Sequence, residues 1–375
     1  MDENKANVFL FLSFGIIEND GRSIELINSL NKVGKTIKLG ITRDEKKANY
    51  DIDSKYLFIG NKKYLSLINY IKFTFFSIST YFKHRKEIDV LFVDNFLSSI
   101  PAMILIMIFR PKVVIQDRRE LYFSKEMKNN SGKIMCYLEE KISKKANLVI
   151  VANKFRQKIL DSFFEGKVSL FTYENIRFLP KNENKFDYYE KKYQNIFKDD
   201  SRTLISTGGI SFQRMVDKLI SDFEKVKTPV KLILVGGGPK DDVNRLKKLI
   251  NKGQKSMDIY LIDKVSMDEL RFLIKKSDVG IVNYHQKDLN NLYCASGKVY
   301  EYLEEGKPII TTENIPLKEF CKVHDVGIAS NDFNKSIDLI FKDYSKFQKN
   351  VYLKKGSFSP IINNESLANE VRKYV

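Results

Sequence analysis

The chain has 375 residues, of which 64 are Lys or Arg and 47 are Asp or Glu, so its formal net charge is +17. Hydrophobic residues make up 43% of the sequence, which is enough for ordinary globular cores and excludes a disordered or fibrous chain. The three cysteines, Cys136, Cys294 and Cys321, are widely spaced and form no CxxC pair. They indicate neither a disulfide framework nor a zinc site, and we expect an intracellular protein.

The N-terminus resembles neither a signal peptide nor a membrane anchor. Its first residues are polar, and the apolar run at residues 8–13 is short and typical of a strand. The longest apolar run, residues 100–109, is shorter than the roughly 20 residues that a membrane span needs. We therefore expect no transmembrane helix.

The first half of the chain alternates short apolar runs with helical patterns. We expect strands at residues 8–13, 36–41, 89–94, 112–117, 147–152 and 167–175, and helices at 23–33, 101–109, 134–144 and 154–164. Strand, helix, strand is the rhythm of a parallel α/β sheet.

Residues 54–86 carry an unusual charge pattern. They include no Asp or Glu, seven Lys or Arg and nine Phe or Tyr. A helix here would carry a broad aromatic face bounded by cations, which suits an anionic membrane surface. An ordinary core helix with basic ends is the alternative.

The second half repeats the α/β pattern after a charged segment. Residues 181–200 lack a clear period and are predicted to link a domain at 1–180 to one at 201–345, with a C-terminal segment, 346–375, that ends in a possible helix. In the second domain we expect strands at 202–209, 231–238, 259–262, 279–284 and 308–312, and helices at 212–223, 241–252, 267–276 and 298–305.

Three strand-to-helix loops carry the candidate chemistry, because ligands of parallel sheets bind at the carboxyl ends of the strands. In the loop before residue 298, Ser296 is a candidate helix cap and Gly297 permits close approach of a ligand. Lys298 is a candidate partner for a diphosphate, and Glu301 for ribose hydroxyls. A capped helix with an incidental Glu is the alternative.

The other two loops are rich in glycine. Gly208 and Gly209 end a strand just before Arg214, which is suited to bidentate contact with phosphate. Gly237 lies in a glycine turn that lacks the GxGxxG spacing, and no P-loop pattern is present. Asp51 and Asp53 follow a polar segment, so we expect a loop there rather than a metal site.

Residues 202–313 resemble the donor-binding half of GT-B glycosyltransferases. The motifs are STGGISFQRMVDKLI, KLILVGGGP, DKVSMDELRFLIKKSDVGIV and SGKVYEYLEEGKPIITT, and their order is most similar to glycosyltransferase family 4, a retaining family that builds bacterial capsule, O-antigen and other surface polysaccharides. The first half resembles this family more loosely, through NDGRSIELINSLNKVGKTIKL, VVIQDRRELYF and ANLVIVANKFRQKIL.

The resemblance implies two Rossmann-like domains that face each other across a cleft, with the acceptor in the first and a nucleotide sugar in the second. It implies that Glu301 binds ribose and that amides around Gly297 and Val299 hold the diphosphate. Arg214 would assist them, Gly208 and Gly209 would border the phosphates, and no metal would be required.

Two positions depart from the family pattern. Tyr293 stands where the family often has a Glu, eight residues before Glu301, and Arg119 stands where it often has a His. Sugar recognition must therefore differ, and the retaining outcome loses support. Asp117 and Glu120 remain near the acceptor position: we favour a structural role for Asp117, while Glu120 is either a general base or a loop-ordering residue.

We therefore predict a hexosyl glycosyltransferase that is cytoplasmic and peripheral on the inner face of the cell membrane. Its expected partners are a nucleotide sugar, a polyprenyl-diphosphate-linked or other lipid-linked glycan acceptor and the anionic membrane. A non-catalytic GT-B subunit is the alternative. A nucleic-acid binder is disfavoured, because the high charge comes without a recognition motif.

Overall fold

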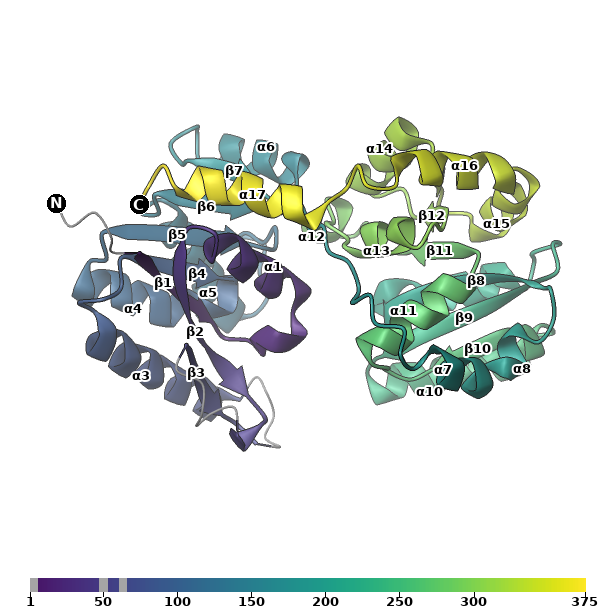
Figure 1. Cartoon of the computed structure of the whole chain (residues 1–375), viewed down its shortest axis with the longest axis horizontal. Coiled ribbons are helices and arrows are strands. Elements are labelled where there is room, and N and C mark those ends of the chain that lie inside the picture. Colours follow the sequence, from purple (N-terminus) through teal and green to yellow (C-terminus); the bar gives the residue numbers. More distant parts are fainter. Residues whose placement is uncertain (1–5, 47–52, 61–65) are drawn as a thin grey trace. The chain divides into compact units, whose positions relative to one another are not determined.

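The structure is a computed structural model that describes residues 6–46, 53–60 and 66–375. The chain forms two compact units (Figure 1). Unit 1 combines the residues up to Asn175 with Pro360–Val375, and unit 2 is Ile176–Ser359. Asp51, Lys62, Lys63 and Tyr64, which belong to motifs discussed above, lie outside the described residues.

Unit 1 is built on a seven-stranded parallel sheet of order β3-β2-β1-β4-β5-β6-β7. The strands are β1 (Asn7–Ser13), β2 (Gly34–Thr42), β3 (Ser54–Phe58), β4 (Val90–Asp94), β5 (Val113–Arg118), β6 (Leu148–Val151) and β7 (Leu170–Thr172). The helices are α1 (Gly21–Leu30), α3 (Leu67–His84), α4 (Ser99–Phe109), α5 (Asn130–Ser143), α6 (Lys154–Phe163) and α17 (Pro360–Val371).

Alternation along the buried strands divides the core of unit 1 between the two faces of the sheet. Leu10 and Leu12 of β1 pack with residues of α3, α4 and α5, whereas Phe9 and Phe11 pack with residues of α1 and α17. Side chains of a strand point alternately to opposite faces, so every face of this sheet is covered by helices.

Unit 2 repeats the same topology with six parallel strands, in the order β10-β9-β8-β11-β12-β13. The strands are β8 (Arg202–Gly209), β9 (Val230–Gly237), β10 (Ile259–Ile262), β11 (Val279–Val282), β12 (Ile309–Thr311) and β13 (Gly327–Ala329). The helices are α7 (Phe186–Lys192), α8 (Gln194–Phe197), α9 (Val216–Phe223), α10 (Lys240–Lys252), α11 (Met267–Lys276), α12 (Leu289–Leu292), α13 (Lys298–Glu304), α14 (Ile315–His324), α15 (Phe333–Lys342) and α16 (Tyr344–Lys354).

Both sheets have the strand order of a doubly wound Rossmann fold, in which the third, second and first strands are followed by the fourth, fifth and sixth. The α/β class with two parallel-sheet domains is therefore confirmed. In each sheet the first and fourth strands are neighbours, and the loops at their carboxyl ends form the switch point where such folds bind ligands.

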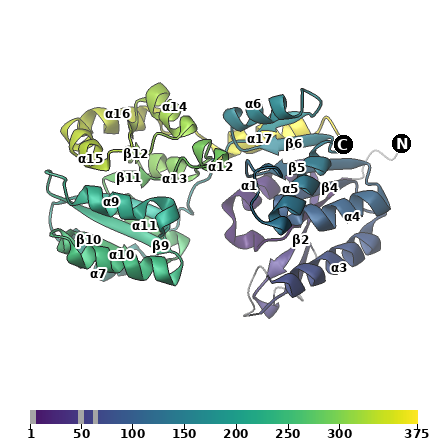
Figure 2. The same cartoon turned by 180° about the vertical axis from the view of Figure 1, so that it is seen from behind.

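The chain connections differ from the expected ones in two places. Residues 181–200 contain α7 and α8. Tyr189 and Ile196 of these helices, and Tyr193 between them, are buried in the core of unit 2. The C-terminal segment is divided, since α16 belongs to unit 2 and α17 to unit 1. α17 lies beside α1, from the other end of the sequence (Figures 1 and 2).

No helix in the described part of the chain combines the length and the apolar character that crossing a bilayer requires.

Candidate functional site

The carboxyl ends of β8 and β9 meet through glycines that cannot be replaced without strain. Gly208 has φ +105° and Gly236 has φ +147°. A Cβ on Gly236 would lie 1.8 Å from the carbonyl oxygen of Gly208. The two loops therefore depend on backbone conformations that glycine adopts far more readily than other residues.

Two cationic side chains lie directly over the Gly208–Gly209 edge. A Cβ on Gly208 would be 3.1 Å from Nζ of Lys298, and a Cβ on Gly209 would be 3.3 Å from Cγ of Arg214. Arg214 ends a short 3-10 helix (Phe212–Arg214) after β8, and Lys298 is the first residue of α13. Folding thus brings together two residues that are 84 positions apart in sequence.

Tyr284, in the loop after β11, lies against both cations. Cζ of Arg214 is 4.5 Å from the ring centroid of Tyr284, and Nζ of Lys298 is 5.7 Å from it. The electron-rich face of an aromatic ring attracts cations at these distances. Tyr284 therefore helps to hold Arg214 and Lys298 next to each other despite their equal charge.

The expected capping role of Ser296 is wrong. The N-cap of α13 is Gly297, which makes no side-chain cap hydrogen bond, and Oη of Tyr284 donates to Oγ of Ser296 at 3.2 Å. The hydroxyl of Ser296 thus helps to hold the Tyr284 side chain in place and does not cap a backbone amide of α13. α13 has only seven residues, so its helix dipole is weak. We therefore attribute the positive electrostatic potential at its start mainly to the Lys298 and Arg214 side chains.

α13 is held in place by Tyr302 at its centre. The amide of Thr207 in β8 donates to Oη of Tyr302 at 3.2 Å, and a Cβ on Gly280 of β11 would collide with the Tyr302 ring at 2.2 Å. The buried Val299 packs in the same core, and Gly306 (φ +75°) ends the helix, as its position in the sequence indicates. These contacts fix Lys298 and Glu301 relative to the β8 loop.

Glu301 has an ion-pair partner that the sequence analysis missed. Nε of Arg177 donates to Oε1 of Glu301 at 2.7 Å, and the Glu301 side chain is only 4% exposed. Arg177 lies in the irregular segment before α7, 124 positions from its partner. No sequence pattern joins residues this far apart, so only the folded chain shows the pair.

The electrostatic environment of Lys298 favours the arrival of an anion. Burial, together with the positive charges of Arg214 and Arg177, lowers the pKa of the Lys298 ammonium to about 8, whereas Glu301 opposes the shift. A group whose charge is disfavoured by its neighbours gains most from a bound negative charge.

Tyr293 and Gly237 are the remaining candidates on unit 2. Tyr293 is the half-buried residue that ends α12. Gly237 lies next to Gly236 on β9, but a Cβ at Gly237 would meet no atom within 4 Å. The requirement for glycine therefore falls on Gly236 rather than on Gly237.

In unit 1, Asp117 is buried and forms an ion pair with Arg22. Its two carboxylate oxygens accept hydrogen bonds from Nε and Nη2 of the buried Arg22 at 2.8 and 2.7 Å. Arg119 donates to Asp94 and to Asp20, and its Nε also lies 3.5 Å from Oδ2 of Asp117. Burial raises the pKa of the Asp94 carboxyl to about 6, against the opposing effect of Arg119.

Glu120 lies at the rim of this network. Its Oε2 is 3.8 Å from Nη2 of the buried Arg156, and its side chain is 43% exposed. Glu120 is thus accessible enough to act as a general base. It also forms an ion pair with Arg156 that can order the loop. Its catalytic role stays a prediction.

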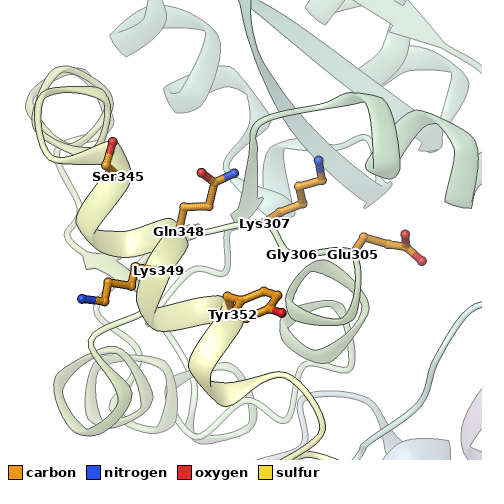
Figure 3. A pocket seen from close by; sticks show the side chains of 7 residues that line it. All are labelled: Glu305, Gly306, Lys307, Ser345, Gln348, Lys349 and Tyr352. Carbon is orange, nitrogen blue, oxygen red and sulfur yellow. The ribbon is translucent and has the colours of Figure 1, made fainter.

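A surface groove of about 440 Å³ lies elsewhere on unit 2 (Figure 3). It is lined by Glu305, Gly306, Lys307, Ser345, Gln348, Lys349 and Tyr352. Residues 305–307 precede β12, so the groove adjoins the amino end of that strand, opposite to the edge where parallel sheets bind ligands. In Figure 3 Lys349 points away from the other lining side chains.

A comparison with protein-family models matches residues 187–355 to the family described as Glycosyl transferases group 1. No protein in the curated set matches the chain. The family match covers the glycine loops, Arg214, Lys298 and Glu301.

Solved structures share the fold over nearly the whole chain. Sucrose-phosphate synthase from Thermosynechococcus elongatus has a TM-score of 0.77 at 14% identity and covers 98% of each chain. HepE from Anabaena, in complex with UDP, has a TM-score of 0.71 at 13% identity over 98% of this chain and 99% of its own. A glycosyltransferase from Rickettsia africae has a TM-score of 0.68 at 14% identity over 99% of both.

The fold is therefore GT-B. Because residues 187–355 match the model of group 1 glycosyl transferases, the protein is a glycosyltransferase.

Proposed function

We propose that the protein transfers a sugar from a nucleotide-diphosphate sugar to a hydroxyl of a membrane-linked surface glycan, in the manner of glycosyltransferase family 4. The observation that carries the proposal is the position of Lys298 and Arg214 over the Gly208–Gly209 edge, with the Glu301 carboxylate one helical turn from Lys298.

The chemistry follows from the charges. When the bond between the sugar and the diphosphate breaks, negative charge builds up on the leaving phosphate oxygens, and preorganised cations stabilise that charge. Arg214 offers a planar fork to two oxygens, and Lys298 offers a point charge. The glycines leave room for the phosphates, and the amides around Gly297 and Val299 add further donors.

Glu301 supplies hydrogen-bond acceptors, whereas Arg214 and Lys298 supply positive charge. A carboxylate accepts hydrogen bonds from hydroxyl groups, and Glu301 is the carboxylate that α13 holds beside the cations. It binds the ribose hydroxyls while the cations hold the diphosphate. Because these cations supply positive charge at the diphosphate, transfer should continue in the presence of EDTA.

The acceptor side of the proposal rests on α3 and α4. Exposed apolar side chains gather on these two helices, which lie side by side (Figures 1 and 2). They are Leu67, Ile68, Ile71, Phe75 and Phe82 of α3 with Met107 and Ile108 of α4, here called the α3–α4 patch. Exposed basic residues accompany the patch: Lys72, Lys83, Arg85, Lys86, Arg110 and Lys112. Such a surface holds an enzyme at an anionic membrane on the cytoplasmic side, where a polyprenyl-linked glycan is accessible.

Calorimetric titration with UDP, GDP, dTDP and CMP sugars tests the donor site. We expect one nucleotide to bind at micromolar concentration and Glu301→Ala to weaken it at least about tenfold, since a hydrogen bond to a charged group is lost. Arg202→Ala, at the other end of β8, is the matched control and should leave binding unchanged.

Tyr293 is the observation that favours a second function, that of a non-catalytic subunit. It stands where the resemblance to glycosyltransferase family 4 leads one to expect a Glu. If wild-type protein binds no nucleotide with or without detergent, a non-catalytic GT-B subunit that binds glycan or a partner transferase becomes the better account.

A further inference from the structure

The segment that leads from β7 to α7 contacts α13 at two points. Besides the ion pair between Arg177 and Glu301, Nζ of Lys181 lies 2.7 Å from Oε1 of Glu304. Between these two pairs, Leu179 is buried in the same apolar cluster as Val299. Residues 177–181 therefore run along α13 and present a cation to each of two successive carboxylates.

The two ion pairs have different surroundings. The Arg177 side chain is 35% exposed and its partner 4% exposed, whereas Lys181 is 66% exposed and its partner 11% exposed. An exposed ion pair such as that between Lys181 and Glu304 contributes little to stability. The pair of the enclosed Glu301 carboxylate is less screened by solvent than the exposed pair.

Arg177 binds one of the two carboxylate oxygens of Glu301. Its Nε donates to Oε1, while Oε2 accepts no hydrogen bond from the described residues and is not sealed from solvent. The carboxylate is thus held at one oxygen and open at the other. Lys298 also interacts electrostatically with Glu301, because the Glu301 carboxylate raises the pKa of the Lys298 ammonium.

We infer that Arg177 is a positioning residue for ribose recognition: it holds Glu301 through Oε1, so that Oε2 accepts the ribose hydroxyls and Lys298 stays available to the diphosphate. The inference rests on the proposed function and adds a residue from outside the glycine loops. Arg177 acts through Glu301 and is not itself a catalytic residue.

The test compares nucleotides with and without ribose hydroxyls. The affinities of UDP and GDP, and of their 2′,3′-dideoxy counterparts, are measured by calorimetry for wild type, Arg177→Gln, Arg177→Lys and Lys181→Gln. Lys181→Gln is the matched control, because it removes the other ion pair of the same segment. Thermal unfolding shows whether each variant is folded.

In the wild type we expect the ribonucleotide to bind about tenfold more tightly than its dideoxy counterpart, as expected for a hydrogen bond to a charged acceptor. Arg177→Gln should remove most of this preference by weakening only the ribonucleotide. Arg177→Lys should restore part of it, and Lys181→Gln should leave it intact. A purely structural role would weaken both nucleotides equally.

The possible failures are distinguishable. If folded Arg177→Gln keeps the wild-type preference for ribose, or if the wild type has no such preference, the inference is wrong while nucleotide binding stands. If the wild type binds no nucleotide, the proposed donor site and the inference both fall.

Discussion

Burial and two neighbouring cations make the charge of Lys298 sensitive to pH near 8. Bound diphosphate favours the ammonium form and raises the pKa of Lys298, so binding takes up a proton at any pH between the free and bound values. Above pH 8 the free protein has to acquire this proton from solvent, and its affinity should fall by up to about tenfold per pH unit.

Calorimetry of nucleoside diphosphate binding between pH 7 and pH 10 checks this prediction. In buffers of different ionisation enthalpy, proton uptake should appear above about pH 8, where the diphosphate itself is already fully ionised. Lys298→Gln should bind more weakly at neutral pH and lose the dependence. A wild-type affinity that is constant up to pH 10 would contradict the assignment of Lys298 to the diphosphate.

Single residues show both the reach and the limit of sequence reasoning. Arg214, Lys298 and Glu301 were proposed from local spacing, because each lies within a few residues of a glycine turn, and the structure brings the first two together over Gly208–Gly209. Arg177 was missed because its partner is 124 positions away. The capping role predicted for Ser296 was wrong. Its hydroxyl accepts a hydrogen bond from Tyr284, and Tyr284 lies in another loop, which local spacing does not show.

At the scale of elements, sequence periodicity predicted the strands of both sheets well, apart from the short edge strands β3 and β13. The segment containing α7 and α8 looked like a linker because it is highly charged. Its helical signal was present in the spacing of Tyr189, Tyr193 and Ile196, which are three and four residues apart and buried on one face. The charged residues between them hid this pattern.

α17 provides a quantitative prediction at the same scale. Its Leu367 and Val371 are fully buried with Leu26 and Leu30 of α1, and Nδ2 of Asn364 donates to Glu25 of α1 at 2.7 Å. Leu367→Ala leaves a cavity in this cluster and should lower the free energy of unfolding by about 2–5 kcal/mol.

Ile361→Ala on the same helix is the control. Ile361 is 72% exposed, so its truncation should change stability by no more than about 0.5 kcal/mol. Urea unfolding followed by circular dichroism measures both variants. Equal effects from the two substitutions would show that α17 does not pack on α1 as described.

For the whole molecule, the distribution of exposed apolar side chains predicts where the protein meets a membrane. Phe75 and Phe82 of the α3–α4 patch are 68% and 54% exposed. Replacing both with Ser should weaken binding to vesicles containing phosphatidylglycerol at least about tenfold, because each ring that leaves the interface loses roughly 1.5–3 kcal/mol of burial.

Co-sedimentation with vesicles of phosphatidylglycerol and of neutral phosphatidylcholine measures this effect. Tyr352→Ser in unit 2 is the control, because that ring is 76% exposed and lies outside the patch. Binding should require the anionic lipid and should decrease with salt. If the double substitution binds like the wild type, the α3–α4 patch is not the membrane surface.

The division of the chain between the units was beyond sequence reasoning. The order of motifs places residues 360–375 after the second domain, and their amphipathic pattern does not say which core they join. The partner of α17 is α1, more than 300 residues earlier, so the assignment depends on a contact that no local pattern encodes.

This arrangement has a consequence for biosynthesis. Unit 2 is one uninterrupted stretch, Ile176–Ser359, whereas unit 1 needs Pro360–Val375 to complete its core. Domains usually finish folding in the order in which the ribosome delivers them. Here the order of completion is reversed: unit 1 begins to leave the exit tunnel before unit 2, but it waits for residues 360–375, while unit 2 is already whole.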